Sequence, residues 1–592
     1  MAIGILLGTG AVLAAAASLP AQEVVAGIPG TSWRECDPTA VTAVARRAKV
    51  RVLASRLILK GEPVPIGQGT GLAGAAPEIA TSDVCVLKLN AAHPVPGPAG
   101  APSTSSGIGI ELWLPAREAW NHRFLSLLPG GFAGDPAVQS TTQMSRSGDD
   151  GFATVHGYAT SVTDLGVQGE RGNVLMLQDG SINSEGWENL SRRASHVVAE
   201  TVKVAAATFY KAAPSFSYVF GCSSGGRASY SAAQNHPDDF DGVLAESPSI
   251  NQTSFPIGLV YPQMIMLREL GGPISMTRLD FVSRAAVAAC DMTVTGKHDG
   301  FLSDPDRCNY DPTKDRSVLC ATDGGNAPGE RCITRREAGV VNRIWYGATR
   351  ETAVIDPSRD SGASPTRAPG QYWWGPYRGT TLMTVANSKN GQPAPFDMAL
   401  DQFALNSEDP GLAAPSFHNA AGNGKEGWKR LDYAGFADLA DRGRVLNERF
   451  ADIDSNNPDL RRFVARGGRM MTIHGLADQN MPPQNSINYY LRVAAVVGGL
   501  ADEQRFHRLF LVPGRAHCGG IGTVGASNVP EIDVHAAMDQ LVNWVERKDA
   551  PIALAANSSD GKMSRPVCAF PRRIRARGPA TGESSDYVCV AD

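Results

Sequence analysis

The feature that most constrains this chain is a short turn between two glycines, Gly221-Cys222-Ser223-Ser224-Gly225. The apolar residues 216–220 before it predict a buried strand, and the small residues of 226–237 after it predict a helix. A sharp strand-to-helix turn of the form G-x-S-x-G exposes its central serine hydroxyl at the end of a sheet. The pattern alone is weak and an ordinary strand-to-helix turn is the alternative, but its flanking elements favour Ser223 as a nucleophile.

A serine hydroxyl is a poor nucleophile without a nearby base, and the chain offers two main candidates for one. His517 lies in a loop directly after the predicted strand 507–512. His474 is its rival, but it ends the predicted strand 469–475 and is expected to be buried in the core. The sequence therefore favours His517 as the general base.

The base in turn needs a carboxylate that fixes its tautomer and stabilises the imidazolium. Asp478 follows a predicted strand directly, whereas Asp502 and Asp533 have no strand before them. The order Ser223, Asp478, His517 is the order of the catalytic residues in α/β-hydrolases. Asp478 is the preferred third member, with the other two aspartates as alternatives.

A tetrahedral oxyanion requires two backbone N–H donors. One is expected from Ser224, the residue after the nucleophile. The other is expected from the turn at 129–132, where Gly130 and Gly131 let the backbone approach a substrate closely. We assign the second N–H to Gly131, with Gly130 beside it.

Strands and helices alternate on both sides of a long middle segment. The predicted strands are 84–89, 108–115, 123–128, 157–166 with its turn, 216–220, 240–248, 469–475 and 507–512, and the predicted helices are 187–211, 226–237, 484–498 and 531–547. This alternation predicts an α/β protein with a parallel sheet and an insertion. We therefore expect an α/β-hydrolase core, residues 22–250 and 466–592, with a large inserted lid domain, residues 251–465.

The start of the chain and its charge indicate where it works. Residues 3–19 are almost all apolar or small, which predicts a signal peptide at 1–21, a buried N-terminal helix being the alternative. The expected location is secreted or periplasmic. With 55 basic and 59 acidic residues the net charge is −4, which argues against nucleic-acid binding. No later apolar run is long enough to span a membrane, so we expect neither nucleic acid nor membrane as a partner.

The cysteine count supports export, because ten cysteines in such a chain favour disulfides over metal thiolates. The sequence does not fix their connectivity. Proximity along the chain suggests four pairs: Cys36 with Cys85, Cys290 with Cys308, Cys320 with Cys332, and Cys568 with Cys589. Cys222 and Cys518 remain, and each is adjacent to an expected catalytic residue. If Ser223 and His517 meet, these two cysteines also come close enough to bond.

At this point the sequence resembles the tannase and feruloyl esterase family. That family has a Cys-Ser pair, an aspartate and a His-Cys pair bridged by a disulfide, which here read Cys222-Ser223, Asp478 and His517-Cys518. Further similar blocks span most of the chain, at 130–135, 157–164, 195–203, 221–227, 240–248, 511–518, 541–551 and 565–589. The resemblance implies an esterase that releases an aromatic acid from a small-molecule ester.

Within the family we expect feruloyl or other hydroxycinnamoyl esters as substrates. Gallate esters, as in tannases, and mono(2-hydroxyethyl) terephthalate are the nearest rivals. A catalytically silent binding protein on the same fold and a serine peptidase are alternatives from other classes. The aromatic side chains Trp373, Trp374 and Phe403 in the expected lid are candidate walls of the acyl pocket, although packing alone also produces buried aromatics.

The resemblance also implies a structural calcium ion in the lid. The matching segment starts at Cys290 and departs from the family pattern, because its middle aspartate is missing and one residue is inserted. The candidate ligands are Asp291, Thr295, Lys297, Asp299 and Phe301. Losing a carboxylate weakens calcium binding, so the alternative is an acidic loop without metal. The sequence gives no indication of the oligomeric state.

Overall fold

The computed structural model describes residues 34–64, 78–91, 107–132, 134–145, 150–167, 171–291, 298–578 and 583–591. The predicted signal peptide at 1–21 lies outside these residues. No helix in the described ranges is long and apolar enough to cross a membrane.

A nine-stranded sheet forms the centre of the molecule, in the order β1-β2-β3-β5-β4-β6-β7-β12-β13. The strands are β1 (Arg51–Ile58), β2 (Val84–Asn90), β3 (Gly109–Pro115), β4 (Arg123–Leu128), β5 (Ala159–Thr163), β6 (Phe216–Cys222), β7 (Gly242–Glu246), β12 (Arg469–Gly475) and β13 (His507–Val512). From β5 to β13 in this order, each strand is parallel to the next one, as predicted. Strands β1, β2 and β3 are antiparallel, so the sheet is mixed rather than wholly parallel. In the described parts of the connections between these first strands there is no helix, and only a crossover connection makes neighbouring strands parallel.

Successive residues of the parallel strands enter two different hydrophobic cores, one on each face of the sheet. Phe124, Val219 and Met470 belong to the first core, and their neighbours Leu125 and Met471 belong to the second. The helices around the sheet are α1 (Pro38–Ala48), α2 (Ser184–Glu188), α3 (Ala194–Tyr210), α4 (Ser224–Asn235), α12 (Gln484–Val497), α13 (Leu500–Glu503) and α14 (Val534–Arg547). Side chains of α3, α4 and α12 fill the first core and those of α14 fill the second. Burial on both faces explains the near-continuous apolar runs of these strands.

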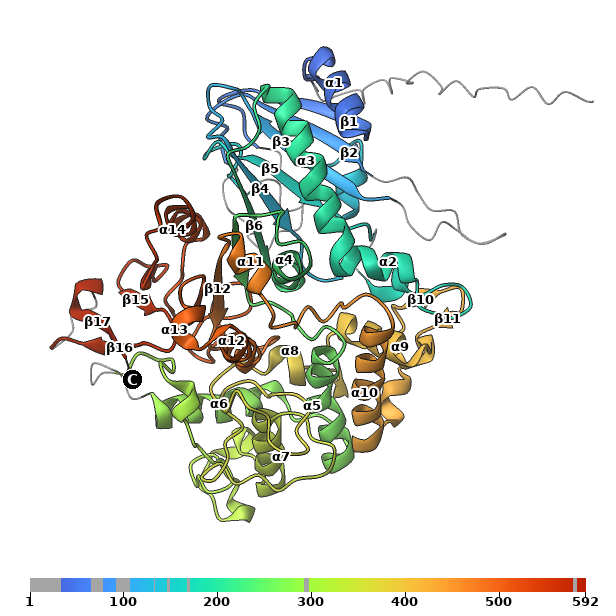
Figure 1. Cartoon of the computed structure of the whole chain (residues 1–592). Helices are drawn as coiled ribbons and strands as arrows, with labels where there is room; N and C mark the ends of the chain where they lie inside the picture. The colour runs from blue at the N-terminus through green and yellow to red at the C-terminus, as the bar shows by residue number, and fades with distance from the viewer. Residues whose placement is uncertain are drawn as a thin grey trace, which may run out of the picture.

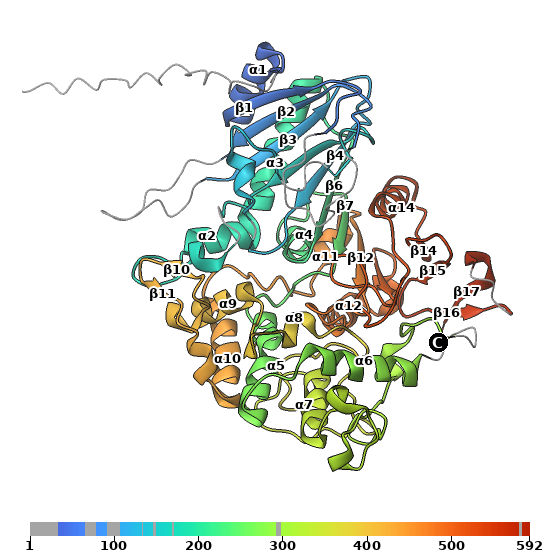
Figure 2. The same ribbon diagram turned by 180° about the vertical axis from the view of Figure 1, so that it is seen from behind.

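The regular elements between β7 and β12 are mainly helices, joined by long loops. These are α5 (Phe255–Leu270), α6 (Met276–Cys290), α7 (Arg335–Tyr346), α8 (Met383–Ala386), α9 (Asp397–Ser407), α10 (Tyr433–Arg449) and α11 (Arg461–Ala465), with the short hairpins β8 (Ser388–Lys389) with β9 (Gln392–Pro393) and β10 (His418–Asn419) with β11 (Gly422–Asn423). Helices α5, α6, α7, α9 and α10 share a separate hydrophobic core. Figures 1 and 2 show them gathered below the sheet in both views. We refer to residues 251–465 as the insertion.

The C-terminal segment adds two small sheets beside α14. One pairs β14 (Ala553–Asn557) with β15 (Ser564–Cys568), and the other pairs β16 (Arg573–Ala576) with β17 (Tyr587–Val590). Five disulfides join Cys36 to Cys85, Cys222 to Cys518, Cys290 to Cys308, Cys320 to Cys332 and Cys568 to Cys589. They are the four local pairs and the one long-range pair expected from the sequence.

Candidate active site

Ser223 forms a strained turn between β6 and α4. Its φ of 59° and ψ of −122° lie in a region that residues other than glycine rarely adopt. The turn is held by neighbouring backbone, because the Ser223 N–H donates to the Glu246 carbonyl at 3.0 Å and the Ser223 carbonyl accepts from the Ser249 N–H at 3.0 Å. The surrounding sheet therefore maintains this conformation.

The two flanking glycines are required by close backbone contacts. A Cβ atom on Gly221 would lie 2.4 Å from the carbonyl carbon of Gly225, and one on Gly225 would lie 2.1 Å from the carbonyl oxygen of Leu128. Neither contact can be relieved by moving a side chain, since both involve backbone. The glycines thus allow α4 to start directly against β6 and β4, as expected for a nucleophile elbow.

Asp478 and His517 are hydrogen-bonded to one another. They follow the parallel strands β12 and β13, and the Asp478 Oδ2 lies 2.8 Å from the His517 Nδ1. The other oxygen, Oδ1, accepts backbone N–H groups from Asn480 at 2.9 Å and Met481 at 2.7 Å. This orientation leaves the Nε2 of His517, the atom that would accept a proton from serine, outside the pair.

The environment of Asp478 keeps it ionised. Burial by itself would raise the pKa of this carboxyl, but the charge on His517 and hydrogen bonds from His474 and His517 lower the pKa well below its usual range. The carboxylate is therefore present throughout the neutral range, where it can stabilise the imidazolium of His517.

His474 has a different role from the base. Its side chain is fully buried, its Nε2 lies 2.8 Å from the Met481 carbonyl oxygen, and its Nδ1 lies 2.8 Å from the Ser486 Oγ. A carbonyl only accepts, so Nε2 carries the proton and also points it toward Asp478 Oδ2, 3.3 Å away. Both ring nitrogens are thus used internally, and His474 positions the aspartate.

A disulfide brings the nucleophile and the base together. Cys222 and Cys518 are 296 residues apart in sequence, and their bond leaves the Cα atoms 5.9 Å apart. Among the described residues, none hydrogen-bonds to the Ser223 Oγ, so the Ser223–His517 hydrogen bond is not formed here. Such bonds often tighten only when a substrate is present.

The turn after β4 approaches Ser223 as expected for an oxyanion hole. A Cβ atom on Gly130 would lie 3.6 Å from the Ser223 Cβ, in ordinary contact. Ser224 begins α4, so its N–H belongs to the helix end whose donors have no partner within the helix. Within the described ranges, no turn or loop hydrogen bond to a backbone carbonyl uses the N–H groups of Ser224, Gly130 or Gly131. Within these ranges the three donors are therefore free to face an oxyanion.

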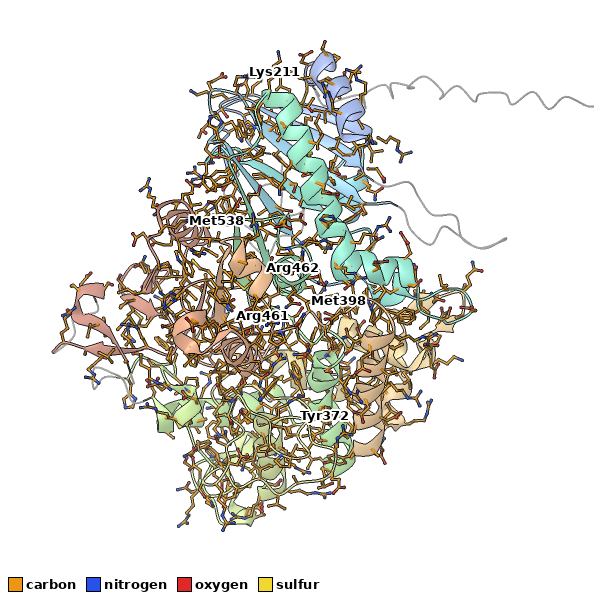
Figure 3. All side chains as sticks on the ribbon, viewed as in Figure 1. Lys211, Tyr372, Met398, Arg461, Arg462 and Met538 are labelled. Atoms are coloured by element: carbon orange, nitrogen blue, oxygen red, sulfur yellow. A yellow bond between two sulfur atoms is a disulfide. The ribbon has the colours of Figure 1, made fainter. Side chains whose placement is uncertain are left out.

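The insertion reaches this turn through helix α9, which the sequence analysis did not identify. A Cβ atom on Gly131 would lie 3.7 Å from the Met398 Sδ, and Figure 3 labels Met398 where the insertion meets the core. Three residues on, Asp401 is fully buried and pairs with Arg171 of the core at 2.5 and 2.7 Å. Nothing local in the sequence marks these residues, because their contacts span 230 positions or more.

Ion pairs of Arg515, which were also not predicted from the sequence, hold the loop of His517 in addition to the disulfide. Arg515 is buried and lies 3.2 Å from Glu246 at the end of β7 and 2.8 Å from Glu531. Burial of Glu246 raises the pKa of that carboxyl, and the charge of Arg515 opposes this rise. Both residues lie in the sequence blocks quoted above, but their pairing depends on the fold.

The three aromatic residues expected to line the acyl pocket are buried in the core of the insertion. Trp373 is 1% exposed, and its ring packs directly against Gly258: a Cβ atom on that glycine would lie only 2.0 Å from the ring. Trp374 donates its indole N–H to the Ser364 carbonyl. Phe403 is fully buried, with its ring edge-on to Phe436. Trp373 and Trp374 also line a small cavity near Gln479, whereas Phe403 lines neither of the cavities described here.

The described part of the candidate calcium loop provides hard oxygen donors. Asp291 and Asp299 are both largely buried; Asp291 accepts the Gly300 N–H, and one Asp299 oxygen pairs with Arg565 at 2.6 Å. The second Asp299 oxygen is buried with no hydrogen-bond partner in the described residues. Carboxylate oxygens of this kind are the ligands that calcium prefers, and one of the two charges is already neutralised by Arg565. Thr295 and Lys297 lie outside the described residues.

Comparison with known proteins gives the same assignment over most of the chain. A family model described as tannase and feruloyl esterase matches residues 100–590. A probable feruloyl esterase of Arthroderma benhamiae is 28% identical over 535 residues, which cover 86% of each chain.

Solved structures share the fold. Feruloyl esterase B from Aspergillus oryzae superposes with a TM-score of 0.68 at 23% identity, covering 91% of this chain and 97% of that one. The tannin acyl hydrolase from Aspergillus niger superposes with a TM-score of 0.69 at 20% identity, covering 93% and 94%. The family match extends over the elbow at Ser223, the Asp478–His517 pair and the insertion between them. The chain therefore belongs to the tannase and feruloyl esterase family.

Proposed function

We propose that this protein is an exported serine esterase that cleaves esters of hydroxycinnamic acids such as ferulic acid. Its family makes it a carboxylic ester hydrolase. The observation that carries the assignment of residues is the strained turn at Ser223 joined by a disulfide to the loop of a hydrogen-bonded Asp478–His517 pair. The relative named a probable feruloyl esterase supports the substrate class.

In the proposed first step, Ser223 attacks the ester carbonyl while the Nε2 of His517 takes its proton. Asp478 holds His517 in the tautomer with Nδ1 protonated, because Oδ2 accepts that hydrogen bond at 2.8 Å. The tetrahedral oxyanion is stabilised by the N–H groups of Ser224 and Gly131. The imidazolium then protonates the departing alcohol, which leaves an acyl-enzyme on Ser223.

In the second step water replaces the alcohol. His517 takes a proton from the water, which attacks the acyl carbonyl, and the same two N–H groups hold the second oxyanion. His517 then returns the proton to the Ser223 oxygen as the aromatic acid departs. Both steps use the same five groups, so the relative placement of these groups must be the same for the ester and for the acyl-enzyme.

The insertion, residues 251–465, is proposed to act as the lid over this site. Its contact with the oxyanion turn through Met398, 3.7 Å from a Cβ position on Gly131, supports that role. We also propose that Asp291, Asp299 and the carbonyl of Phe301 bind a structural calcium ion, which would stabilise the lid and take no part in the reaction. Five disulfides support the proposed export.

A panel of esters tests the proposal. The mature protein and its Ser223→Ala variant are assayed on methyl ferulate, methyl gallate and mono(2-hydroxyethyl) terephthalate, with a peptide anilide as comparison. We expect the highest kcat/KM for methyl ferulate, by about 100-fold or about 2.7 kcal/mol, and no turnover by Ser223→Ala. A preference for the gallate or the terephthalate ester would mean that the proposed substrate class is wrong. Hydrolysis of the anilide, or failure to hydrolyse any of the esters, would refute the proposal.

A further inference from the structure

A large cavity lies away from the catalytic residues. It has a volume of about 580 Å³ and is lined by three parts of the chain: residues 303–309 and 357–365 of the insertion, positions on both sides of β13, and residues 565–574 of the C-terminal segment. None of Ser223, Gly131, Asp478 and His517 lines it. Its size lies in the range of small-molecule sites.

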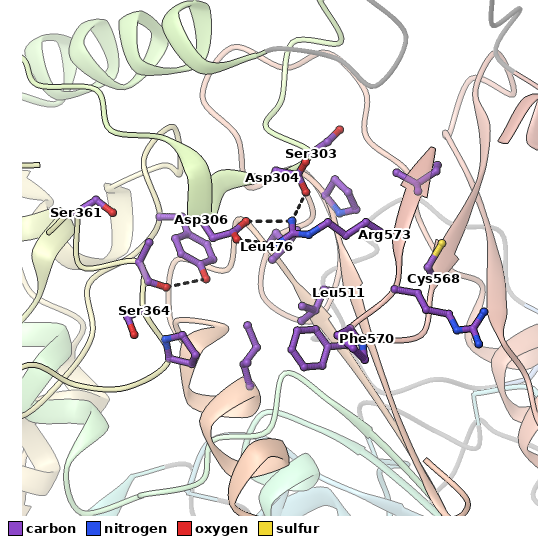
Figure 4. Close-up of a pocket in the computed structure, with 18 of the residues that line it drawn as sticks. Ser303, Asp304, Asp306, Ser361, Ser364, Leu476, Leu511, Cys568, Phe570 and Arg573 are labelled. Atoms are coloured by element: carbon purple, nitrogen blue, oxygen red, sulfur yellow. Dashed lines mark hydrogen bonds and ion pairs between the residues drawn. The ribbon is translucent and has the colours of Figure 1, made fainter. Parts of the chain in front are cut away.

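One side of the cavity is apolar and aromatic. Tyr377 is buried and belongs with Leu476 and the partly buried Leu511 to one hydrophobic cluster. Phe570 adds a second ring from the C-terminal segment, and Figure 4 shows it beside Leu511. A flat apolar group, such as an aromatic ring, matches this surface.

Two arginines that line the cavity are already paired with aspartates. Arg573 reaches both Asp304 and Asp306, the latter at 2.8 Å, as Figure 4 shows. Arg565 pairs with Asp299 at 2.6 Å. An anionic ligand would have to compete with these aspartates for Arg565 or Arg573, so this part of the wall favours a neutral ligand.

Uncharged polar groups remain available in the same wall. Within the described ranges, no residue hydrogen-bonds to the side-chain polar atoms of Ser303, Ser361 or Asn309. The other two arginines of the wall, Arg359 and Arg572, are exposed at its rim, where solvent screens them. Hydroxyl and amide groups without internal partners are suited to ligand hydroxyls.

We propose that this cavity binds a neutral molecule with an aromatic ring at one end and several hydroxyl groups at the other, such as an aryl glycoside. The ring lies against Tyr377 and Phe570, and the hydroxyl groups bond to Ser303, Ser361 and Asn309. The site is separate from Ser223 and does not depend on the proposed reaction.

Calorimetric titration of the folded protein with 4-hydroxyphenyl β-D-glucopyranoside tests the proposal. The probe is not an ester, and the titration is repeated after Ser223 has been blocked by a serine-reactive phosphonate. We expect saturable binding at one site, with a Kd that the phosphonate changes by less than about twofold. Absence of saturable binding, or its loss after phosphonylation, would overturn the proposal.

Matched variants locate the binding. Ser364→Trp places a large side chain in the cavity from an exposed loop position, and Thr366→Trp places it on the same loop outside the cavity. We expect Ser364→Trp to weaken binding by about tenfold or more and Thr366→Trp to leave it unchanged. Ser361→Trp serves if Ser364→Trp fails to fold, with ester hydrolysis as the check of folding. Equal binding by the cavity variant and the control would contradict the site, and tighter binding of 4-hydroxybenzoate would contradict the neutral ligand.

Discussion

Asp478→Asn should abolish nearly all activity, and the hydrogen bonds around Asp478 give the reason. Two backbone N–H groups, from Asn480 and Met481, point at Oδ1. Because these groups only donate, the oxygen of the new amide must take the Oδ1 position. Its NH2 group then occupies the Oδ2 position, facing His517 Nδ1 at 2.8 Å and His474 Nε2 at 3.3 Å.

An NH2 group at that position forces the wrong tautomer on His517. Nδ1 must now accept a hydrogen bond, so the ring proton moves to Nε2, the nitrogen that should take the proton of Ser223. We expect kcat/KM to fall by about 10³- to 10⁴-fold, or about 4–5 kcal/mol of transition-state stabilisation. Most of the loss should appear in kcat, because no contact to substrate is removed.

The assay compares kcat and KM for methyl ferulate in the wild type, Asp478→Asn and Asp533→Asn. Asp533 caps helix α14 by accepting the Ala536 N–H at 2.8 Å, and Asn caps a helix equally well, so this control should keep full activity. The melting temperatures of all three proteins exclude unfolding as the cause. Activity of Asp478→Asn within about tenfold of wild type, or a comparable loss in Asp533→Asn, would refute the assignment of the carboxylate.

Three further predictions follow from other parts of the structure. The double variant Cys222→Ser, Cys518→Ser should lose more than about tenfold in kcat/KM and melt at a lower temperature, since the chain-entropy argument gives a bond across 296 residues about 6 kcal/mol; full activity would contradict the link. Burial, together with the charge of Asp452, raises the pKa of Asp454 to about 7. The folded protein therefore loses stability as the pH rises from about 4 to 7, because the unfolded chain releases this proton and the folded chain keeps it. Urea unfolding should show the Asp454→Asn variant becoming more stable relative to the wild type over that range. Calcium should raise the melting temperature of the EDTA-treated protein and not that of Asp291→Asn; an equal response in both would exclude Asp291 as a ligand.

The candidate catalytic residues could be predicted because their signals are local. The elbow needs glycines at fixed offsets from Ser223 for steric reasons, and Asp478 and His517 each directly follow an apolar run that reads as a strand. The five disulfides followed from spacing and from the expected meeting of Ser223 with His517. Each inference used residues at most 49 positions apart or one simple consequence of the fold.

What the sequence did not predict depends on contacts between distant segments. Helices α5, α6 and α9 were missed because their apolar residues pack on several sides, which weakens a helical period. Helix α7 is amphipathic and begins with a capping box at Thr334, so the sequence did carry a signal for it. The burial of Trp373 and Phe403 was not foreseeable, since an aromatic residue in a lid has the same sequence signal whether it packs or binds. The contact of Met398 with the oxyanion turn depends on how α9 docks on the core.

The loop that carries His517 follows β13, whereas the nucleophile Ser223 follows β6, and these two strands are not neighbours in the sheet. The loop is attached to the ends of β6 and β7, and these attachments explain how His517 can still act on Ser223. Strands β6 and β13 are separated in the sheet by β7 and β12. Cys222 and Glu246 are register partners at the ends of β6 and β7, and they bind Cys518 and Arg515 of the same loop. One tie is covalent and the other is a buried ion pair, so the loop loses freedom before substrate arrives. Placing Nε2 of His517 near Ser223 therefore costs little at the moment of reaction, which is what proton transfer from serine requires.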